Sequence, residues 1–171
     1  MIAISCVSKN WVIGDSVTNK IPWSVKEDLT FFKEKTLNQN ILVGANTFSE
    51  LPVLKNRKVW VFTSSDADRA INKNGCEGHY LDSQYILWDK SNLHKEKFNQ
   101  LKENLILCGG GQLYELFLPI CMELFLTELN FEVDVVSPVY FPYDKDYLNQ
   151  KFGKIEKIQE FGRGVINRYY N

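Results

Sequence analysis

Asp28 is the residue in this sequence best suited to catalysis or ligand binding, because it is an acid placed among aromatic residues. If the residues after position 24 form a helix, Asp28 shares a face with Phe31 and Phe32, at i+3 and i+4, and lies near Trp23. Burial among aromatic rings disfavours the charged form of a carboxyl group and raises its pKa. Such an acid can transfer a proton or bind a cationic heterocycle. The alternative is an ordinary first-turn acid that stabilises the helix dipole.

Two apolar runs end in glycine and lead directly into predicted helices, at residues 41–47 (ILVGANT) and 105–114 (LILCGGGQLY). A strand followed by glycine and a helix N-terminus brings free backbone N–H groups close to an anion. Two such junctions can hold the phosphates of a dinucleotide. Neither matches the GxGxxG spacing, so the alternative is that these glycines only make tight turns.

Two further polar residues have types suited to ligand binding. The planar fork of Arg57, just before a predicted strand, suits a carboxylate, although a solvated cation is the alternative. Thr127 lies in an otherwise apolar run, where a buried hydroxyl needs a partner such as Asp28. The sequence has no Ser/His/Asp triad and no Walker motif, and His79 and His94 lack partners at metal-ligand spacing.

These residues depend on a predicted alternation of strands and helices. Ser24 as N-cap and Glu27 three residues later form a capping-box pattern, which predicts a helix to about residue 37. Residues 15–20 form a polar loop, either a lid or a plain surface connection. Strands are predicted at residues 1–8, 41–43, 58–63, 79–81, 105–108, 123–129, 152–160 and 165–170. Further helices are predicted at residues 45–52, 83–88 and 112–118, with a helix or loop at 90–104 and a loop at 131–142.

This order predicts an α/β fold with a mainly parallel sheet, helices on both faces and an antiparallel C-terminal edge. Gly162-Arg163-Gly164 is a hairpin signal between the last two strands. A length of 171 residues favours one domain. The net charge of −1 argues against a nucleic-acid or basic membrane surface. Neither a transmembrane run nor a signal peptide is visible, and four widely spaced cysteines without a CxxC motif favour a reducing cytoplasm.

Six segments together resemble the dihydrofolate reductase family over nearly the whole chain. They are NWVIG (10–14), IPW (21–23) before SVKEDLTFFK, VGANTF (43–48), LKNRK (54–58), CGGGQLYELFLP (108–119) and LTEL (126–129). The resemblance implies a single dihydrofolate-reductase-like domain over residues 1–171. It implies NADPH-dependent reduction of 7,8-dihydrofolate to tetrahydrofolate for one-carbon and nucleotide synthesis. It also implies a cytoplasmic monomer, without metal, nucleic acid or membrane, that binds antifolate inhibitors.

The resemblance also assigns site residues. Asp28 matches the pocket acid, Thr127 the threonine that hydrogen-bonds to it, and Trp23 a tryptophan that holds an ordered water; these three form the expected catalytic set. The other expected substrate-binding residues are Ile4, Ser5, Leu29, Phe32, Leu51, Leu54, Arg57, Cys108 and Tyr114. The expected cofactor-binding residues are Cys6, Ile13, Gly14, Asn19, Gly44, Ala45, Asn46, Thr47, Thr63, Ser64, Cys108, Gly109, Gly110, Gly111, Gln112, Leu113 and Tyr114. The Gly109-Gly110 peptide is expected to be cis.

The sequence departs from the family pattern at three places. Ala45 stands where many members carry an arginine that grips the 2′-phosphate, so NADPH is expected with NADH tolerated. The same GA-x-TF form occurs in some phage-encoded members. Residues 137–140 (SPVY) replace an acidic-Thr pair, so different loop contacts are expected there. Residues 66–104 are longer than in compact members.

Two other functions fit parts of the pattern. One is a related pyrimidine reductase of riboflavin synthesis. Asp28 in an aromatic pocket and Arg57 both argue against it. The other is a non-catalytic folate- or nucleotide-binding module, and Asp28 and Thr127 argue against that.

Overall fold

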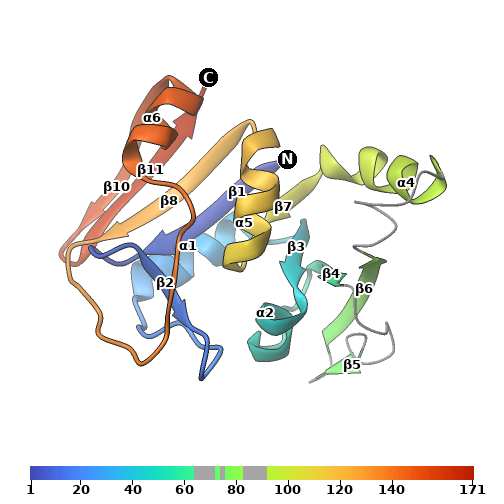
Figure 1. Ribbon diagram of the computed structural model, residues 1–171, viewed down its shortest axis with the longest axis horizontal. Coiled ribbons are helices and arrows are strands. Elements are labelled where there is room, and N and C mark those ends of the chain that lie inside the picture. Colours follow the sequence, from blue (N-terminus) through green and yellow to red (C-terminus); the bar gives the residue numbers. More distant parts are fainter. Residues whose placement is uncertain (64–71, 74–75, 83–91) are drawn as a thin grey trace.

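The computed structural model describes residues 1–63, 72–73, 76–82 and 92–171, and Figure 1 shows their arrangement. The strands are β1 (Ile2–Val7), β2 (Val12–Asp15), β3 (Asn40–Gly44), β4 (Lys58–Thr63), β5 (Asn72–Lys73), β6 (Cys76–Asp82), β7 (Leu105–Leu107), β8 (Glu123–Leu129), β9 (Pro138–Tyr140), β10 (Lys154–Phe161) and β11 (Gly164–Tyr170). The helices are α1 (Lys26–Thr36), α2 (Ala45–Glu50), α4 (Asn92–Lys102), α5 (Gly111–Phe117) and α6 (Lys145–Phe152), with a 3-10 turn, η2 (Leu118–Ile120).

Nine of these strands form one sheet in the order β10-β11-β8-β1-β7-β3-β4-β6-β5. The six from β8 to β6 pair in parallel, whereas β10, β11 and β5 are antiparallel to their neighbours. Figure 1 shows β10 and β11 at one end of the sheet and β6 and β5 at the other. The predicted parallel sheet with an antiparallel C-terminal edge is therefore confirmed.

The sheet separates two apolar cores, because successive side chains of a strand point to opposite faces. Ile41 and Val43 of β3 lie in one core with Phe31 of α1 and Phe48 of α2, and we call this the α1 core. Leu42 faces the other side. That second core, the α5 core, also receives Phe98 of α4, Leu113 and Phe117 of α5, and Leu148 and Phe152 of α6. Helices thus cover both faces, as predicted, with α5 in front of the sheet and α1 behind it in Figure 1.

Aromatic contacts fix α1 on its face of the sheet. The Phe31 ring meets the Phe125 ring of β8 edge-on, with centroids 5.6 Å apart and planes at 60°. Such a pair contributes about 0.5–1.5 kcal/mol beyond the burial of its area. Asp28 lies one turn before Phe31, so this contact also fixes the position of the carboxyl group.

The start of α1 differs from the prediction. The helix begins at Lys26, Val25 is the N-cap with an extended backbone, and that cap makes no side-chain hydrogen bond. Ser24 is therefore not the cap, and the capping box predicted with Glu27 is wrong. The Ser24 carbonyl instead accepts a 3.3 Å hydrogen bond from Arg163 in the β10–β11 turn, a long-range contact that holds this segment before the helix.

The loop predicted for residues 131–142 contains strand β9, and helix α6 follows where no element was predicted. β9 pairs antiparallel with β2, and α6 begins at the Asp144 N-cap, whose carboxylate accepts a 2.9 Å hydrogen bond from the Tyr147 amide. α6 ends at Gly153, which has φ +50°. The helix predicted for residues 112–118 ends one residue earlier, and the chain passes through Pro119 in η2. Residues 90–104 contain α4, whereas the helix predicted at 83–88 lies outside the described residues.

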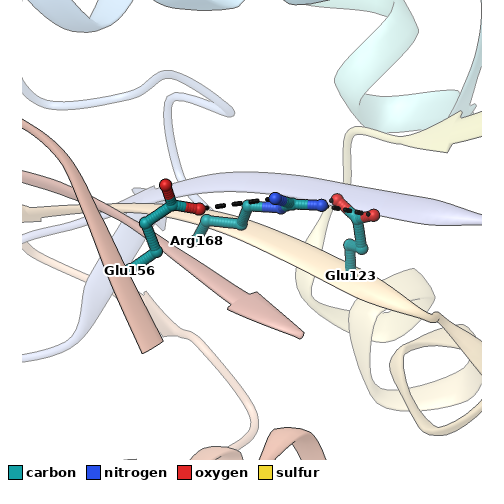
Figure 2. A network of polar contacts seen from close by, with 3 residues as sticks. All are labelled: Glu123, Glu156 and Arg168. Carbon is teal, nitrogen blue, oxygen red and sulfur yellow. Dashed lines mark hydrogen bonds and ion pairs between the residues drawn. The ribbon is translucent and has the colours of Figure 1, made fainter. Parts of the chain in front are cut away.

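A network of charged side chains links three strands, β8, β11 and β10, at one edge of the sheet. Arg168 of β11 donates two hydrogen bonds to Glu123 of β8, at 2.9 and 3.0 Å, and one of 3.3 Å to Glu156 of β10. Figure 2 shows the guanidinium between the two carboxylates. Exposed ion pairs add little stability, so this network mainly favours the observed register of three strands.

Candidate active site

The parallel strands β1 and β7 separate at their carboxyl ends. Their pairing ends at Ala3–Leu107, whereas β1 remains paired with β8 as far as Val7. Beyond β7, the Cys108 amide donates to the Leu42 carbonyl of β3 instead. After β1 the chain crosses one face through α1, and after β7 it crosses the other face through α5. Such a switch in direction is where α/β sheets bind ligands.

Asp28 lies on one side of this switch point with Cys6 and Thr127. Cys6 of β1 and Thr127 of β8 are register partners, and both side chains lie close enough to the Asp28 carboxyl to act on its pKa. The pKa of Asp28 is raised because burial removes the carboxyl from water, whereas the polar side chains of Thr127 and Cys6 act to lower it. The predicted rise in the pKa of Asp28 is confirmed. The group is suited to holding a proton or pairing with a basic heterocycle.

Trp23 and Asp28 both lie near the Cys6 thiol. Burial raises the pKa of this thiol most, the charge of Asp28 raises it further, and the Trp23 side chain lowers it. The sequence placed Cys6 only among the cofactor-binding residues, and that role remains a prediction. Its place beside the acid was missed, although the strand alternation that puts Ile4 and Cys6 on one face gives a signal for it.

Tyr114 of α5 reaches the same site from the other face. Its hydroxyl donates a 2.7 Å hydrogen bond to the Ile4 carbonyl, just beyond the last β1–β7 pair. Burial raises the pKa of Tyr114 against a smaller lowering effect of the nearby Ser5 side chain, so the phenol is neutral. Ile4, Ser5 and Tyr114 are therefore brought together, with Cys108 at the adjacent strand end.

The two glycine junctions lie side by side at the ends of β3 and β7. The Gly44 amide donates a 2.9 Å hydrogen bond to the Gly109 carbonyl, and neither helix that follows has a side-chain cap. A Cβ on Gly110 would lie 3.2 Å from Thr47 Oγ1, and a Cβ on Gly44 would lie 3.2 Å from Leu113. The Gly109-Gly110 peptide is cis, as expected. The glycines let the two junctions pack closely together, and we call the paired starts of α2 and α5, with their uncapped backbone amides, the cradle.

The contacts place only some of the remaining cofactor candidates at this cradle. Ile13 and Val139, from the β2–β9 pair, lie near the position of a Cβ on Gly111. Gly14 and Asn19 lie on the segment joined by the Asp15–Lys20 bridge, and Thr63 is buried at the end of β4. Ala45, Asn46, Thr47, Gln112 and Leu113 belong to the first turns of α2 and α5. Ser64 lies outside the described residues.

Arg57 lies between α1 and the end of β7. Its Nη2 donates a 3.4 Å hydrogen bond to the Lys33 carbonyl, and its charge lowers the pKa of the Cys108 thiol against the larger effect of burial. Its Nε is buried and finds no hydrogen-bond partner among the described residues. Leaving such a donor unpaired costs about 1–3 kcal/mol, so the fork is suited to an anion that binds there.

Four apolar candidates lie on the α1 side of the sheet. Phe32 of α1 and Leu51 and Leu54 after α2 pack on the α1 core while remaining partly accessible. Leu29 is 55% exposed on α1. These side chains therefore offer accessible apolar surface on the same side of the sheet as Asp28.

The described part of the chain contains neither a membrane-spanning helix nor a cluster of metal-ligand side chains. Its helices are all too short or too polar to span a membrane. Its His, Cys, Asp and Glu side chains do not gather in threes or more at distances that would hold a metal ion.

The comparisons with known proteins all indicate the same family. The family model described as dihydrofolate reductase matches residues 1–162. The dihydrofolate reductase of Buchnera aphidicola subsp. Acyrthosiphon pisum is 34% identical over 146 residues, covering 84% of this chain and 80% of that protein. That of Mycoplasma pneumoniae is 29% identical over 160 residues, covering 92% and 88%.

A solved structure matches the fold. It is a dihydrofolate reductase from Enterococcus faecalis complexed with NADP(H) and RAB-propyl, with a TM-score of 0.65 and 22% identity over 98% of this chain and 92% of that one. The family match, the relatives and the position of Asp28 at the switch point agree, and this chain belongs to the dihydrofolate reductase family.

Proposed function

We propose that this protein reduces 7,8-dihydrofolate to 5,6,7,8-tetrahydrofolate with NADPH, consuming one proton. The observation that carries the proposal is Asp28, a buried carboxyl of raised pKa near the register partners Thr127 and Cys6 at the switch point of the sheet. Its family and its relatives support the same reaction. The product would serve one-carbon and nucleotide synthesis.

The substrate is held at two ends in this proposal. Asp28 accepts hydrogen bonds from the pterin, and Thr127 orients the carboxylate. The carbonyls of Ile4 and Cys108 face the pterin edge. Arg57 supplies its fork, with the otherwise unpartnered Nε, to the glutamate carboxylate. Between these ends the pterin and benzoyl groups contact an apolar wall formed by Leu29, Phe32, Leu51 and Leu54.

The cradle of the two glycine junctions fits a dinucleotide, because the starts of α2 and α5 lie side by side and neither has a side-chain cap for its backbone amides. We propose that backbone amides at the starts of α2 and α5 hold the phosphates, and that Thr47, Thr63 and Ser64 donate hydrogen bonds. NADPH, when bound, supplies the hydride. Tyr114 lies at the end of the cradle, where it hydrogen-bonds to the Ile4 carbonyl. In this proposal its ring would lie beside the nicotinamide and orient it.

Asp28 keeps the pterin in a form that can accept a proton, and we expect water to deliver that proton. Placing the two reactants at attack distance accounts for much of the rate enhancement in such a site. Antifolate inhibitors with a basic heterocycle would pair with the same carboxylate. We further propose one domain over residues 1–171 and a monomer, in the cytoplasm that the cysteine spacing favours.

The test is a spectrophotometric assay of the purified chain with dihydrofolate and NADPH. We expect NADPH oxidation that depends on both compounds and yields tetrahydrofolate. Turnover of an aminopyrimidine substrate of the riboflavin pathway but not of dihydrofolate would contradict the substrate assignment. Folate binding without turnover of either compound would contradict catalysis itself.

A further inference from the structure

One asparagine side chain fastens the turn between β1 and β2 to the connection between β8 and β9. Asn10 Nδ2 donates a 2.9 Å hydrogen bond to the Val133 carbonyl, and Asn10 Oδ1 accepts a 3.2 Å hydrogen bond from the Val133 amide. The two residues lie 123 positions apart along the chain. The side-chain amide therefore pairs with a distant backbone segment much as a neighbouring strand would.

Asn10 is itself held by Ser8, which is buried at the end of β1. The Val12 amide donates a 3.0 Å hydrogen bond to the Ser8 hydroxyl, and this hydroxyl donates a hydrogen bond of 2.7 Å to Asn10 Oδ1. A hydroxyl can accept one hydrogen bond while it donates another. The orientation of the Asn10 side chain is thus fixed from its own turn as well as from Val133.

Trp11 lies between these contacts in a backbone conformation that bulky residues rarely adopt, with φ +61°. Its amide donates to the Ser8 carbonyl, and its carbonyl accepts from the Phe141 amide, both at 2.9 Å. Such a conformation persists only where the surrounding structure imposes it. Here the preceding residue is fixed by Val133, and the carbonyl of Trp11 is fixed by the residue that follows β9.

Aromatic rings connect this turn to the cradle. The Trp11 and Phe141 ring centroids are 6.3 Å apart, and those of Phe141 and Tyr114 are 5.1 Å apart. Phe141 and Tyr114 are buried in the α5 core, where close packing transmits a displacement from one side chain to the next. The position of the Trp11 ring therefore limits where the Tyr114 ring can lie.

We propose that Asn10 is a positioning residue, whose paired hydrogen bonds with Val133 hold Trp11 and, through the Phe141 ring, set the orientation of Tyr114 beside the nicotinamide. The effect on hydride transfer rests on the proposed function, but the effect on the Tyr114 ring does not. A small misplacement of a reactant slows the chemical step, so the change belongs in kcat.

The first measurement is a fluorine NMR spectrum of the ligand-free chain labelled with fluorotyrosine, with the Tyr114 signal assigned by its loss in Tyr114→Phe. Asn10→Ala removes the hydrogen bonds to Ser8 and Val133, so the Tyr114 signal should shift. Asn10→Asp keeps an acceptor but sets a second oxygen against the Val133 carbonyl, so it should also shift this signal.

Asn130→Ala is the matched control. Asn130 lies on the same β8–β9 connection, and its Nδ2 donates a 3.0 Å hydrogen bond to the Gly162 carbonyl, away from Trp11. Its Tyr114 signal should stay in place. Phe141→Leu interrupts the row of rings, so adding Asn10→Ala to that variant should move the Tyr114 signal no further.

The second measurement is turnover with dihydrofolate and NADPH. Asn10→Ala should lower kcat about tenfold with little change in the KM for dihydrofolate, because the geometry of the reactants changes more than their binding. A loss of folding stability alone would leave the kcat of the folded protein unchanged. Asn130→Ala should keep the kcat of the unchanged protein.

An unshifted Tyr114 signal in the Asn10 variants would overturn the inference, and so would a full further shift when Asn10→Ala is added to Phe141→Leu. A shifted signal with an unchanged kcat would overturn the effect on hydride transfer. If Asn10→Ala does not fold, Asn10→Asp decides the question. Absence of turnover in the unchanged chain would contradict the proposed function instead, because the NMR measurement does not depend on activity.

Discussion

The Gly44 amide donates a 2.9 Å hydrogen bond to the Gly109 carbonyl, and this bond holds the two strand-to-helix junctions edge to edge. Gly109 has φ +100°, a region that side chains rarely adopt, and a Cβ there would lie 3.0–3.2 Å from the Tyr114 ring. The cradle and the tyrosine beside it therefore depend on one residue without a side chain.

Gly109→Ala should weaken the cradle through both strain and crowding. A non-glycine residue in such a backbone region costs about 1–3 kcal/mol, and the Tyr114 ring must also move. We expect a lower unfolding temperature and at least about a tenfold weaker Kd for NADPH, measured by fluorescence titration. Gly162→Ala is the control, since a Cβ there meets nothing within 4 Å. Unchanged stability and affinity in Gly109→Ala would contradict the role of this glycine.

Arg57→Ala should act on substrate affinity. Hydrogen bonds to charged groups contribute about 1.5–3 kcal/mol, so we expect the KM for dihydrofolate to rise roughly 10- to 100-fold. A pterin without the glutamate tail should be affected far less. Lys55→Ala removes an exposed cation from the same turn and serves as the control for net charge. An equal rise in KM for both substrates would exclude a tail-binding role for Arg57.

Ala45→Arg should widen the preference for NADPH over NADH. Ala45 begins α2, where the family pattern often has a cation for the 2′-phosphate. We expect the change mainly in the KM for NADPH, and high salt should reduce it because the added contact is ionic. Ala45→Gln adds a long neutral side chain and should not widen the preference. If the unchanged protein already rejects NADH strongly, the inference from Ala45 is wrong.

The strands and the candidate residues that depend on local sequence patterns could be predicted from the sequence. The alternation of apolar runs and helices placed β3, β4, β7 and β8 nearly to the residue, because each run is buried on both faces of the sheet. Asp28 was singled out by its helical spacing to Phe31 and Phe32 and its nearness to Trp23, and the family resemblance favoured it over an ordinary first-turn acid. Its raised pKa agrees with the burial that this spacing implies.

The features that could not be predicted from the sequence depend mostly on contacts between residues far apart along the chain. The segment before α1 is held by Arg163, more than a hundred residues away along the chain, so the local cap signal of Ser24 was misleading. β9 forms by pairing with β2, and Pro138 within it and Pro142 after it led to the prediction of a loop. α6 was missed although two local signals, the Asp144 N-cap and Gly153, mark its ends. The place of Cys6 beside Asp28 required the β1–β8 register.

The raised pKa of Asp28 also predicts how stability depends on pH. The folded protein binds this proton more tightly than the unfolded chain, so the contribution to stability is complete below the unfolded carboxyl range. It is lost as the pH rises through the folded-state pKa. In urea unfolding of ligand-free protein, Asp28→Asn should therefore gain stability relative to the unchanged protein between acid and neutral pH. A difference that stays constant over this range would contradict the cost of burying the charge.

The most direct test of Asp28 as the pocket acid is the turnover of dihydrofolate by Asp28→Asn. General acid–base contributions are about a hundredfold to ten-thousandfold, so at neutral pH the NADPH-dependent rate should fall within that range. The Kd for NADPH should change little, since the cradle at Gly44 and Gly109 is built from other elements. A rate close to that of the unchanged protein, with the same tetrahydrofolate product, would remove Asp28 from the mechanism and contradict the account.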